Sequence, residues 1–267
     1  MSALSGGNDT GRMGMSHILR RFYLPPQKIK KKSVIEGEER HHLEDVLRLK
    51  LGDEIEIIDG EGNVYRAEII QLDKRKASIT IKEQYFVPPP SVKIHLGISL
   101  LKTKAMDLVI QKATELGVWA IYVCTTKYSV PFLKEKEKKI KRWQKLAIEA
   151  LKQSGNNYLP KIKIISFEEI LAQKQGIKLI AVGPREEKAN PILSVFKNLQ
   201  KKEVLICIGP EGGFAKEEIN QAKENNFVPI SLNPYILRAE TATIAALSII
   251  QNIFWRAWRD SNPRPAD

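Results

Sequence analysis

The stretch VLICIGPEGGFAKEEI, residues 204–219, decides how this chain of 267 residues folds. It begins as an apolar, β-branched run typical of a buried strand and ends as a polar run with helical character, so a glycine-rich turn joins a strand to a helix. Loops of this kind usually hold phosphate, because backbone N–H groups and a helix N-terminus stabilise anions. This loop, however, contains Glu211 and lacks the Gly-Lys-Ser/Thr ending of a P-loop. A ligand other than a nucleoside triphosphate is therefore indicated.

Strands and helices alternate on both sides of this stretch. The strand-like runs are VKIHLGISLL, VWAIYVCTT, KLIAVG, EVLICIG and FVPISL, and helical runs lie between or after them. This alternation predicts an α/β fold with a mostly parallel sheet covered on both faces. Ligands of such sheets bind at the C-terminal ends of the strands, where strands turn into helices. Three loops of this chain are expected there: 182–191, 208–214 and 233–243.

The front part of the chain has a different pattern. Short strand-like runs separated by turn signals predict a small β-barrel, interrupted by a helical stretch at 38–52 that Gly52 ends. The three prolines of VPPPS cannot continue a central strand and form a stiff spacer, so we place the domain boundary there. The expected divisions are a disordered or tag-like extension at 1–15, the β-barrel domain at 16–87, a proline-rich linker at 88–91, the α/β domain at 92–259 and a flexible tail at 260–267.

The composition limits the partners of the chain. It has 43 Lys and Arg against 31 Asp and Glu, a net charge of +12. A surplus of this size is common in proteins that bind RNA or DNA, and it also occurs where charge only maintains solubility. No apolar run reaches the roughly 18–20 residues of a membrane span, so we expect a soluble protein without a membrane partner.

The cysteines and histidines indicate a reducing compartment and no metal. Cys124 and Cys207 lie in apolar strand-like runs, where a thiol behaves as a small hydrophobic group, and they form no CxxC pair. The four histidines do not combine with them at the spacing of metal ligands. We therefore expect a cytoplasmic protein without a metal site.

The loop before the last helix has the clearest catalytic pattern. In LRAET, Arg238 and Glu240 stand two residues apart where the apolar helical run begins. A carboxylate in the first turn of a helix is stabilised by the unpaired N–H groups and the helix dipole. The pair also fits a purely structural role, with Glu240 as a favourable first-turn charge and Arg238 as its ion-pair partner. This loop alone leaves both interpretations open.

Four segments carry a resemblance to a known family. They are KATELGV at 112–118, LAIEALKQSGNNYLPKI at 146–162, IGPEGGF at 208–214 and LRAETA at 237–242. Together they resemble the RsmE family, SPOUT-class methyltransferases that act on uridine N3 in 16S ribosomal RNA. The front part agrees, because RFYLP and HHLEDVLRLKLGDEIEIIDGEG look like the PUA-like RNA-binding domain of that family. The resemblance extends over about residues 16–256.

The resemblance implies an enzyme that uses S-adenosylmethionine. It also implies a SPOUT-type fold with a C-terminal deep trefoil knot, a cofactor bent among the knotted loops and an active site at a homodimer interface. The residues that it places at the cofactor are Gly183, Pro184, Gly209, Pro210, Glu211, Gly212, Gly213, Leu232, Ile236, Leu237, Arg238 and Glu240.

The glycine loop suits such a cofactor. S-adenosylmethionine carries a sulfonium cation rather than a triphosphate, so a P-loop lysine would serve no purpose and Glu211 is tolerable beside it. The glycines let the backbone approach the adenine closely. Glu211 either braces the loop through hydrogen bonds, which we favour, or contacts the ligand.

The resemblance also makes Arg238 and Glu240 the expected catalytic residues. Uridine N3 carries a proton, so a base must remove it; Glu240 is the expected acceptor, while Arg238 stabilises the charge that spreads onto O2 and O4. The basic run at 134–145 is either an RNA contact or a solvated helix face. The residues expected to contact RNA are Arg20, Arg21, Arg40 and Arg48.

Other functions remain open at this point. A catalytically silent RNA-binding module needs the barrel and the basic surfaces but not intact loops, and a nucleotide hydrolase needs the Lys and Ser/Thr that are missing here. A SPOUT enzyme acting on transfer RNA or large-subunit RNA is the nearest alternative. The sequence favours an enzyme that methylates 16S ribosomal RNA in the assembled small subunit.

Overall fold

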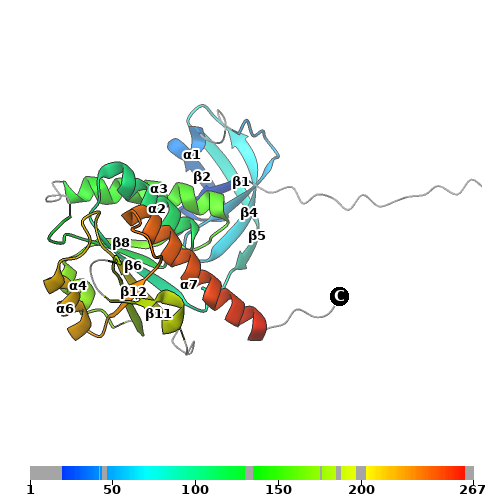
Figure 1. The fold of residues 1–267 in the computed structure, drawn as a ribbon. Coiled ribbons are helices and arrows are strands. Elements are labelled where there is room, and N and C mark those ends of the chain that lie inside the picture. The colour runs from blue at the N-terminus through cyan, green and yellow to red at the C-terminus, as the bar shows by residue number, and fades with distance from the viewer. Residues whose placement is uncertain are drawn as a thin grey trace, which may run out of the picture.

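The structure, a computed structural model, consists of two sheets with their helices (Figure 1). It describes residues 20–41, 43, 47–129, 135–174, 176–184, 188–196 and 203–261, with 257–261 as backbone only. The extension predicted at 1–15 and most of the tail predicted at 260–267 lie outside the described residues, and the last helix extends to Ser261.

The front part of the chain forms a five-stranded sheet in the order β1-β3-β4-β5-β2. The strand β1 pairs with β3 in parallel, and the other neighbours are antiparallel. Alternate residues of the strands, such as Phe22, Ile55 and Ile57, are buried in one apolar core, as a two-residue period requires. The bounds are β1 Arg20–Tyr23, β2 Lys32–Glu36, β3 Glu54–Ile58, β4 Asn63–Leu72 and β5 Lys76–Phe86, with the 3-10 helix η1 at Pro26–Lys28.

Two details of this part differ from the prediction. The pairings of the described strands leave β1 and β2 as edges, only four and five residues long, so the sheet is open where a barrel was expected. The helix predicted at 38–52 also extends too far: α1 is described at Glu38–His41, residues 42 and 44–46 lie outside the described residues, and the helix has ended by residue 48. Arg48 has φ +53°, which a right-handed helix excludes. Leu43, within the predicted helix, is buried in the core of the sheet.

The second sheet has seven strands in the order β10-β12-β9-β11-β6-β7-β8, and every pairing in it is parallel. This confirms the predicted parallel sheet. Its strands are β6 Lys93–Ser99, β7 Ala120–Cys124, β8 Lys161–Ile164, β9 Ile177–Ala181, β10 Asn190–Pro191, β11 Glu203–Ile208 and β12 Val228–Ser231. Its helices are α2 Thr103–Glu115, α3 Lys136–Ser154, α4 Phe167–Leu171, α5 Ile192–Val195, α6 Lys216–Glu224 and α7 Ala239–Ser261.

Helices cover both faces of this sheet (Figure 1). On one face α2, α3 and α7 share a core with Ile206 of the central strand β11, and on the other α4 and α6 pack against Leu205 and Cys207. The strand β11 is therefore apolar at consecutive positions, as expected of a strand buried on both sides.

Both cysteines are buried free thiols in the core under α4 and α6. Burial raises the pKa of the Cys124 thiol to about 12, so this thiol stays protonated and packs as a small apolar group. Within the part of the chain that is described, no helix is long and apolar enough to cross a membrane.

Candidate active site

The glycine loop follows β11 and makes a tight turn. The Gly213 N–H donates to the Pro210 carbonyl at 2.9 Å, and Gly213 has φ +73°, a conformation that favours glycine. A Cβ on Gly209 would lie 3.1 Å from the Phe214 ring and 3.2 Å from the carbonyl carbon of Gly213. The loop therefore needs these two glycines to fold back on itself.

Glu218, which the sequence analysis missed, braces this loop. Its carboxylate accepts the Ala215 N–H and the Lys127 N–H, each at 2.8 Å, and so ties the start of α6 to the loop after β7. Glu211, for which bracing was favoured, is exposed, and no hydrogen bond to its side chain is found among the described residues. The sequence signal for Glu218 was its place three residues after Ala215, the spacing of a capping box.

The third loop carries the arginine–glutamate pair to the start of α7. The Tyr235 N–H donates to the Asn233 side-chain carbonyl at 2.7 Å, and the Ala242 N–H donates to the Arg238 carbonyl at 2.8 Å. Arg238 is exposed and Glu240 is half-buried in the first helical turn. In the described structure neither side chain has a hydrogen-bond or ion-pair partner. The ion pair required by the purely structural interpretation is therefore not formed.

The three loops share one cavity at the C-terminal ends of β9, β11 and β12. Its volume is about 570 Å³, including space open to solvent. Among the described residues that line it, Glu211 is the one charged side chain, and most of the wall is apolar or glycine. The lining residues are Ala181, Val182, Gly183, Pro184, Ile208, Gly209, Pro210, Glu211, Gly213, Leu232, Asn233, Tyr235, Ile236, Leu237, Ala239 and Ala242.

The cavity brings together most of the residues that the sequence placed at a cofactor. Arg238, Glu240 and Gly212 are not part of its wall; Arg238 and Glu240 stand directly beside lining residues, and Gly212 packs against Tyr128. The predicted residues in the wall are Gly183, Pro184, Gly209, Pro210, Glu211, Gly213, Leu232, Ile236 and Leu237. The lining residues that the sequence analysis did not name are Ala181, Val182, Ile208, Asn233, Tyr235, Ala239 and Ala242.

The four arginines expected to contact RNA differ in availability. Arg40 is only 3% exposed, and its guanidinium donates twice to the Asp73 carbonyl, at 2.6 and 3.1 Å. Arg21 donates hydrogen bonds to Glu56 of the front sheet and to Asn156 and Asn157 in the segment before β8. Arg20 and Arg48 are exposed.

The described residues contain no group of three His, Cys, Asp or Glu side chains able to hold a metal ion.

Two family models match the chain. The model described as an RNA methyltransferase domain matches residues 88–251, and the model described as an RNA methyltransferase PUA domain matches residues 35–82. The ribosomal RNA small subunit methyltransferase E of Bacillus subtilis is 33% identical over 228 residues, covering 81% of this chain and 88% of the relative. The protein of the same name from Buchnera aphidicola subsp. Acyrthosiphon pisum is 34% identical, covering 82% and 87%.

Solved structures are similar over most of their length. The ribosomal RNA small subunit methyltransferase E of Neisseria gonorrhoeae, bound to S-adenosylmethionine, has a TM-score of 0.77 at 30% identity, covering 88% of this chain and 98% of that one. A Legionella pneumophila protein in complex with the same cofactor has a TM-score of 0.79 at 30% identity, with the same coverage.

Proposed function

The chain belongs to the RNA methyltransferase family of the ribosomal RNA small subunit methyltransferases E, and on this premise we propose its reaction. It transfers a methyl group from S-adenosylmethionine to N3 of a uridine in 16S ribosomal RNA of the assembled small subunit. One observation carries the proposal: the glycine turn and the loop that opens α7 line a single cavity.

The residues of the cavity fit this cofactor. Ile208, Leu232 and Leu237 give apolar walls suited to the adenine, and the glycines leave backbone groups open to close approach. Glu211 suits a positively charged ligand, whereas a triphosphate would be repelled. When bound, S-adenosylmethionine supplies an electrophilic methyl group on a cationic sulfur. The residues Gly183, Pro184, Gly209, Pro210, Glu211, Gly212, Gly213, Leu232, Ile236, Leu237, Arg238 and Glu240 are proposed to hold it.

Arg238 and Glu240 are the proposed catalytic residues. Glu240 accepts the N3 proton of the uridine, and Arg238 stabilises the negative charge that spreads onto O2 and O4. Their side chains have no intramolecular partner within the described chain, so both are available to a substrate at the mouth of the cavity. Because N3 of a uridine is normally paired or stacked, the base must be extruded before it reaches them.

The knot and the dimer belong to this proposal. The three loops that meet at the cavity are the segments expected to form a deep trefoil knot. Tyr235 and Ile236 are 76% and 65% exposed beside the cavity, an arrangement that favours burial against a second copy of the chain. A homodimer would therefore complete each site with residues of the partner. Light scattering tests this: a monomer at micromolar concentration contradicts it.

The structure reduces the set of arginines proposed to contact RNA. Arg20 and Arg48 are exposed and are the proposed phosphate contacts of the PUA-like sheet. The basic run of α3 is partly neutralised, because Arg142 pairs with Asp107 and Lys145 with Glu38.

Both buried thiols are unpaired, which is consistent with a cytoplasmic enzyme acting on ribosomes.

Nucleoside mapping tests the proposed function. In cells that lack the protein, mass mapping of ribosomal RNA should show loss of 3-methyluridine from the small-subunit RNA and no other change. Loss from transfer RNA or large-subunit RNA instead would support the alternative SPOUT enzyme. If every modification persists and calorimetry detects no binding of S-adenosylmethionine, the chain is a silent RNA-binding protein.

Gly209→Ala should weaken the binding of S-adenosylmethionine by about tenfold or more. The added methyl would lie 3.1–3.2 Å from the Phe214 ring and the Gly213 carbonyl carbon, so the loop must shift by some tenths of an ångström. Isothermal titration calorimetry measures the effect. Gly52→Ala is the control for strain outside the site: Gly52 has φ +89°, so alanine strains the backbone there, but the residue lies outside the cavity and the affinity should stay native. Equal affinities of Gly209→Ala and the native chain would contradict the proposed role of the loop.

A further inference from the structure

The two sheets meet at a junction formed by the hairpin tip 59–63 and the segment 156–160. The Gly62 N–H donates to the Asn157 carbonyl at 3.1 Å, and the Leu159 N–H donates to the Gly60 carbonyl at 2.9 Å. Glu61 and Tyr158 form an antiparallel bridge between these bonds. The junction is thus a short piece of β-structure shared by the two parts of the chain.

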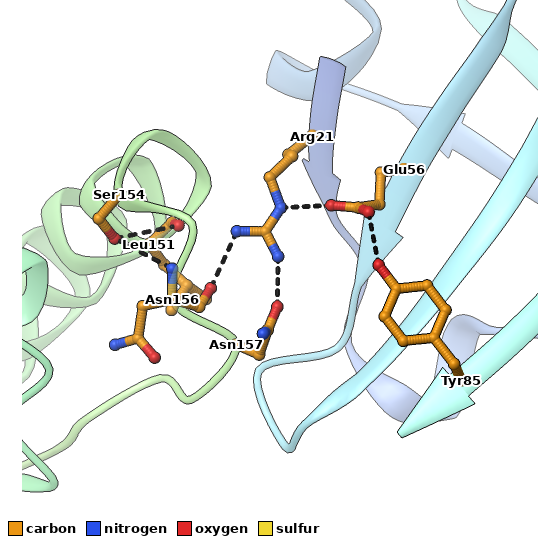
Figure 2. Close-up of polar contacts among 7 residues, drawn as sticks. All are labelled: Arg21, Glu56, Tyr85, Leu151, Ser154, Asn156 and Asn157. Carbon is orange, nitrogen blue, oxygen red and sulfur yellow. Dashed lines mark hydrogen bonds and ion pairs between the residues drawn. The ribbon is translucent and has the colours of Figure 1, made fainter. Parts of the chain in front are cut away.

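Arg21 adds a directional contact across this junction (Figure 2). Its Nε donates to Glu56 Oε2 at 2.6 Å within the front sheet, one terminal nitrogen donates to the Asn156 carbonyl at 3.1 Å, and the other donates to Asn157 Oδ1. Glu56 in turn accepts the Tyr85 hydroxyl at 2.8 Å. The Arg21 side chain is only 11% exposed, so its planar guanidinium group makes its hydrogen bonds inside the protein rather than with solvent.

The linker is also anchored at the junction. The Tyr158 hydroxyl donates to the Val87 carbonyl at 2.6 Å, where the proline-rich linker begins. Tyr158 lies so close to Gly62 that a Cβ on Gly62 would clash with its hydroxyl. The linker therefore starts from a fixed point, although its composition alone indicates only a stiff spacer.

Further contacts on either side of the junction also join the two parts of the chain. Ile58 and Val64 of the front sheet share a buried cluster with Leu151 of α3. Lys152 of α3, with its side chain 8% exposed, pairs with Glu39 at 2.7 Å. Apolar burial, an ion pair and the backbone bonds all oppose a hinge motion between the sheets.

We propose that Arg21 is a positioning residue that fixes the angle between the PUA-like sheet and the methyltransferase sheet. The inference rests on the proposed function, because a fixed angle matters when RNA held by one sheet must present a base to the cavity of the enzyme. Segment 156–160 leads into the start of β8, so the junction lies at the N-terminal edge of the parallel sheet. The cavity lies at the opposite edge, and Arg21 acts through geometry rather than by contact with the reacting atoms.

Hydrogen exchange tests the junction without any assumption about the reaction. In Arg21→Lys, which keeps the charge but loses the planar fork, the amides of Gly62 and Leu159 should exchange at least tenfold faster. The amide of Ile206, in the buried centre of the parallel sheet, should be unchanged. Arg66→Lys is the matched control, because Arg66 is an exposed arginine of the same sheet that pairs with Glu83 only within that sheet. Unchanged Gly62 and Leu159 exchange in Arg21→Lys overturns the proposal.

Kinetics then separate positioning from direct RNA binding. With methyl-deficient small subunits as substrate, Arg21→Lys and Asn157→Ala should each lower kcat by about 10–100-fold, and the double variant no further. Their affinity for S-adenosylmethionine should stay within twofold of the native value. A phosphate contact would instead be rescued by lysine and would change mainly KM, so native kcat in Arg21→Lys overturns the proposal. If the native protein itself fails to methylate small subunits, the proposed function fails, while hydrogen exchange still decides the role of Arg21.

Discussion

Arg238→Ala should lower the rate of methyl transfer by about 10²–10³-fold while leaving the affinity for S-adenosylmethionine within a few fold. The guanidinium is permanently charged and exposed at the start of α7, without an intramolecular partner in the described residues. It can therefore stabilise negative charge on the uracil oxygens as the N3 proton leaves. The side chain is not part of the cavity wall, so its removal should affect the reacting base more than the bound cofactor.

Two measurements check this result. Single-turnover methylation of small subunits gives the rate, and calorimetry gives the affinity for S-adenosylmethionine. Arg66→Ala, which removes an exposed arginine far from the cavity, should match the native protein in both. A large loss of cofactor affinity in Arg238→Ala would assign Arg238 to binding instead of catalysis.

Glu240→Gln should slow methyl transfer by about 10²–10⁴-fold, because an amide cannot accept the N3 proton. Single-turnover methylation of small subunits measures the rate. Glu240 lies at the second position of α7, close to the Ala239 that lines the cavity.

Glu217→Gln is the matched control for this variant. Glu217 is likewise at the second position of a helix, α6, and is not part of the cavity wall. Its pKa is lowered, chiefly by a backbone hydrogen bond and by Lys127, as expected of a first-turn carboxylate. Glu217→Gln should keep the native rate. If Glu240→Gln keeps the native rate, Glu240 is not the base.

The parts of the fold that depend on local patterns were predictable. The run LICI is apolar at consecutive positions because β11 is buried on both faces. An unbroken apolar run of this length predicts a strand of a parallel sheet. The helix predicted at 38–52 extended too far, because its apolar pattern continues past Arg48, whose φ of +53° excludes a right-handed helix. Most of the residues in the cavity wall could be predicted, because each of the three loops contains glycine or proline, which mark turns in a sequence.

The sequence by itself determined that strands and helices alternate after the linker, that three loops end on one edge of a parallel sheet, and that the chain resembles one methyltransferase family. These properties follow from hydrophobic period, turn chemistry and short motifs, which act over a few residues. Only the tertiary structure decided that Glu218 rather than Glu211 braces the glycine loop, that Arg40 is buried, and that Arg21 joins the two sheets. An arginine looks the same in sequence whether it faces solvent or a carbonyl more than a hundred residues away, because its partner is set by long-range packing.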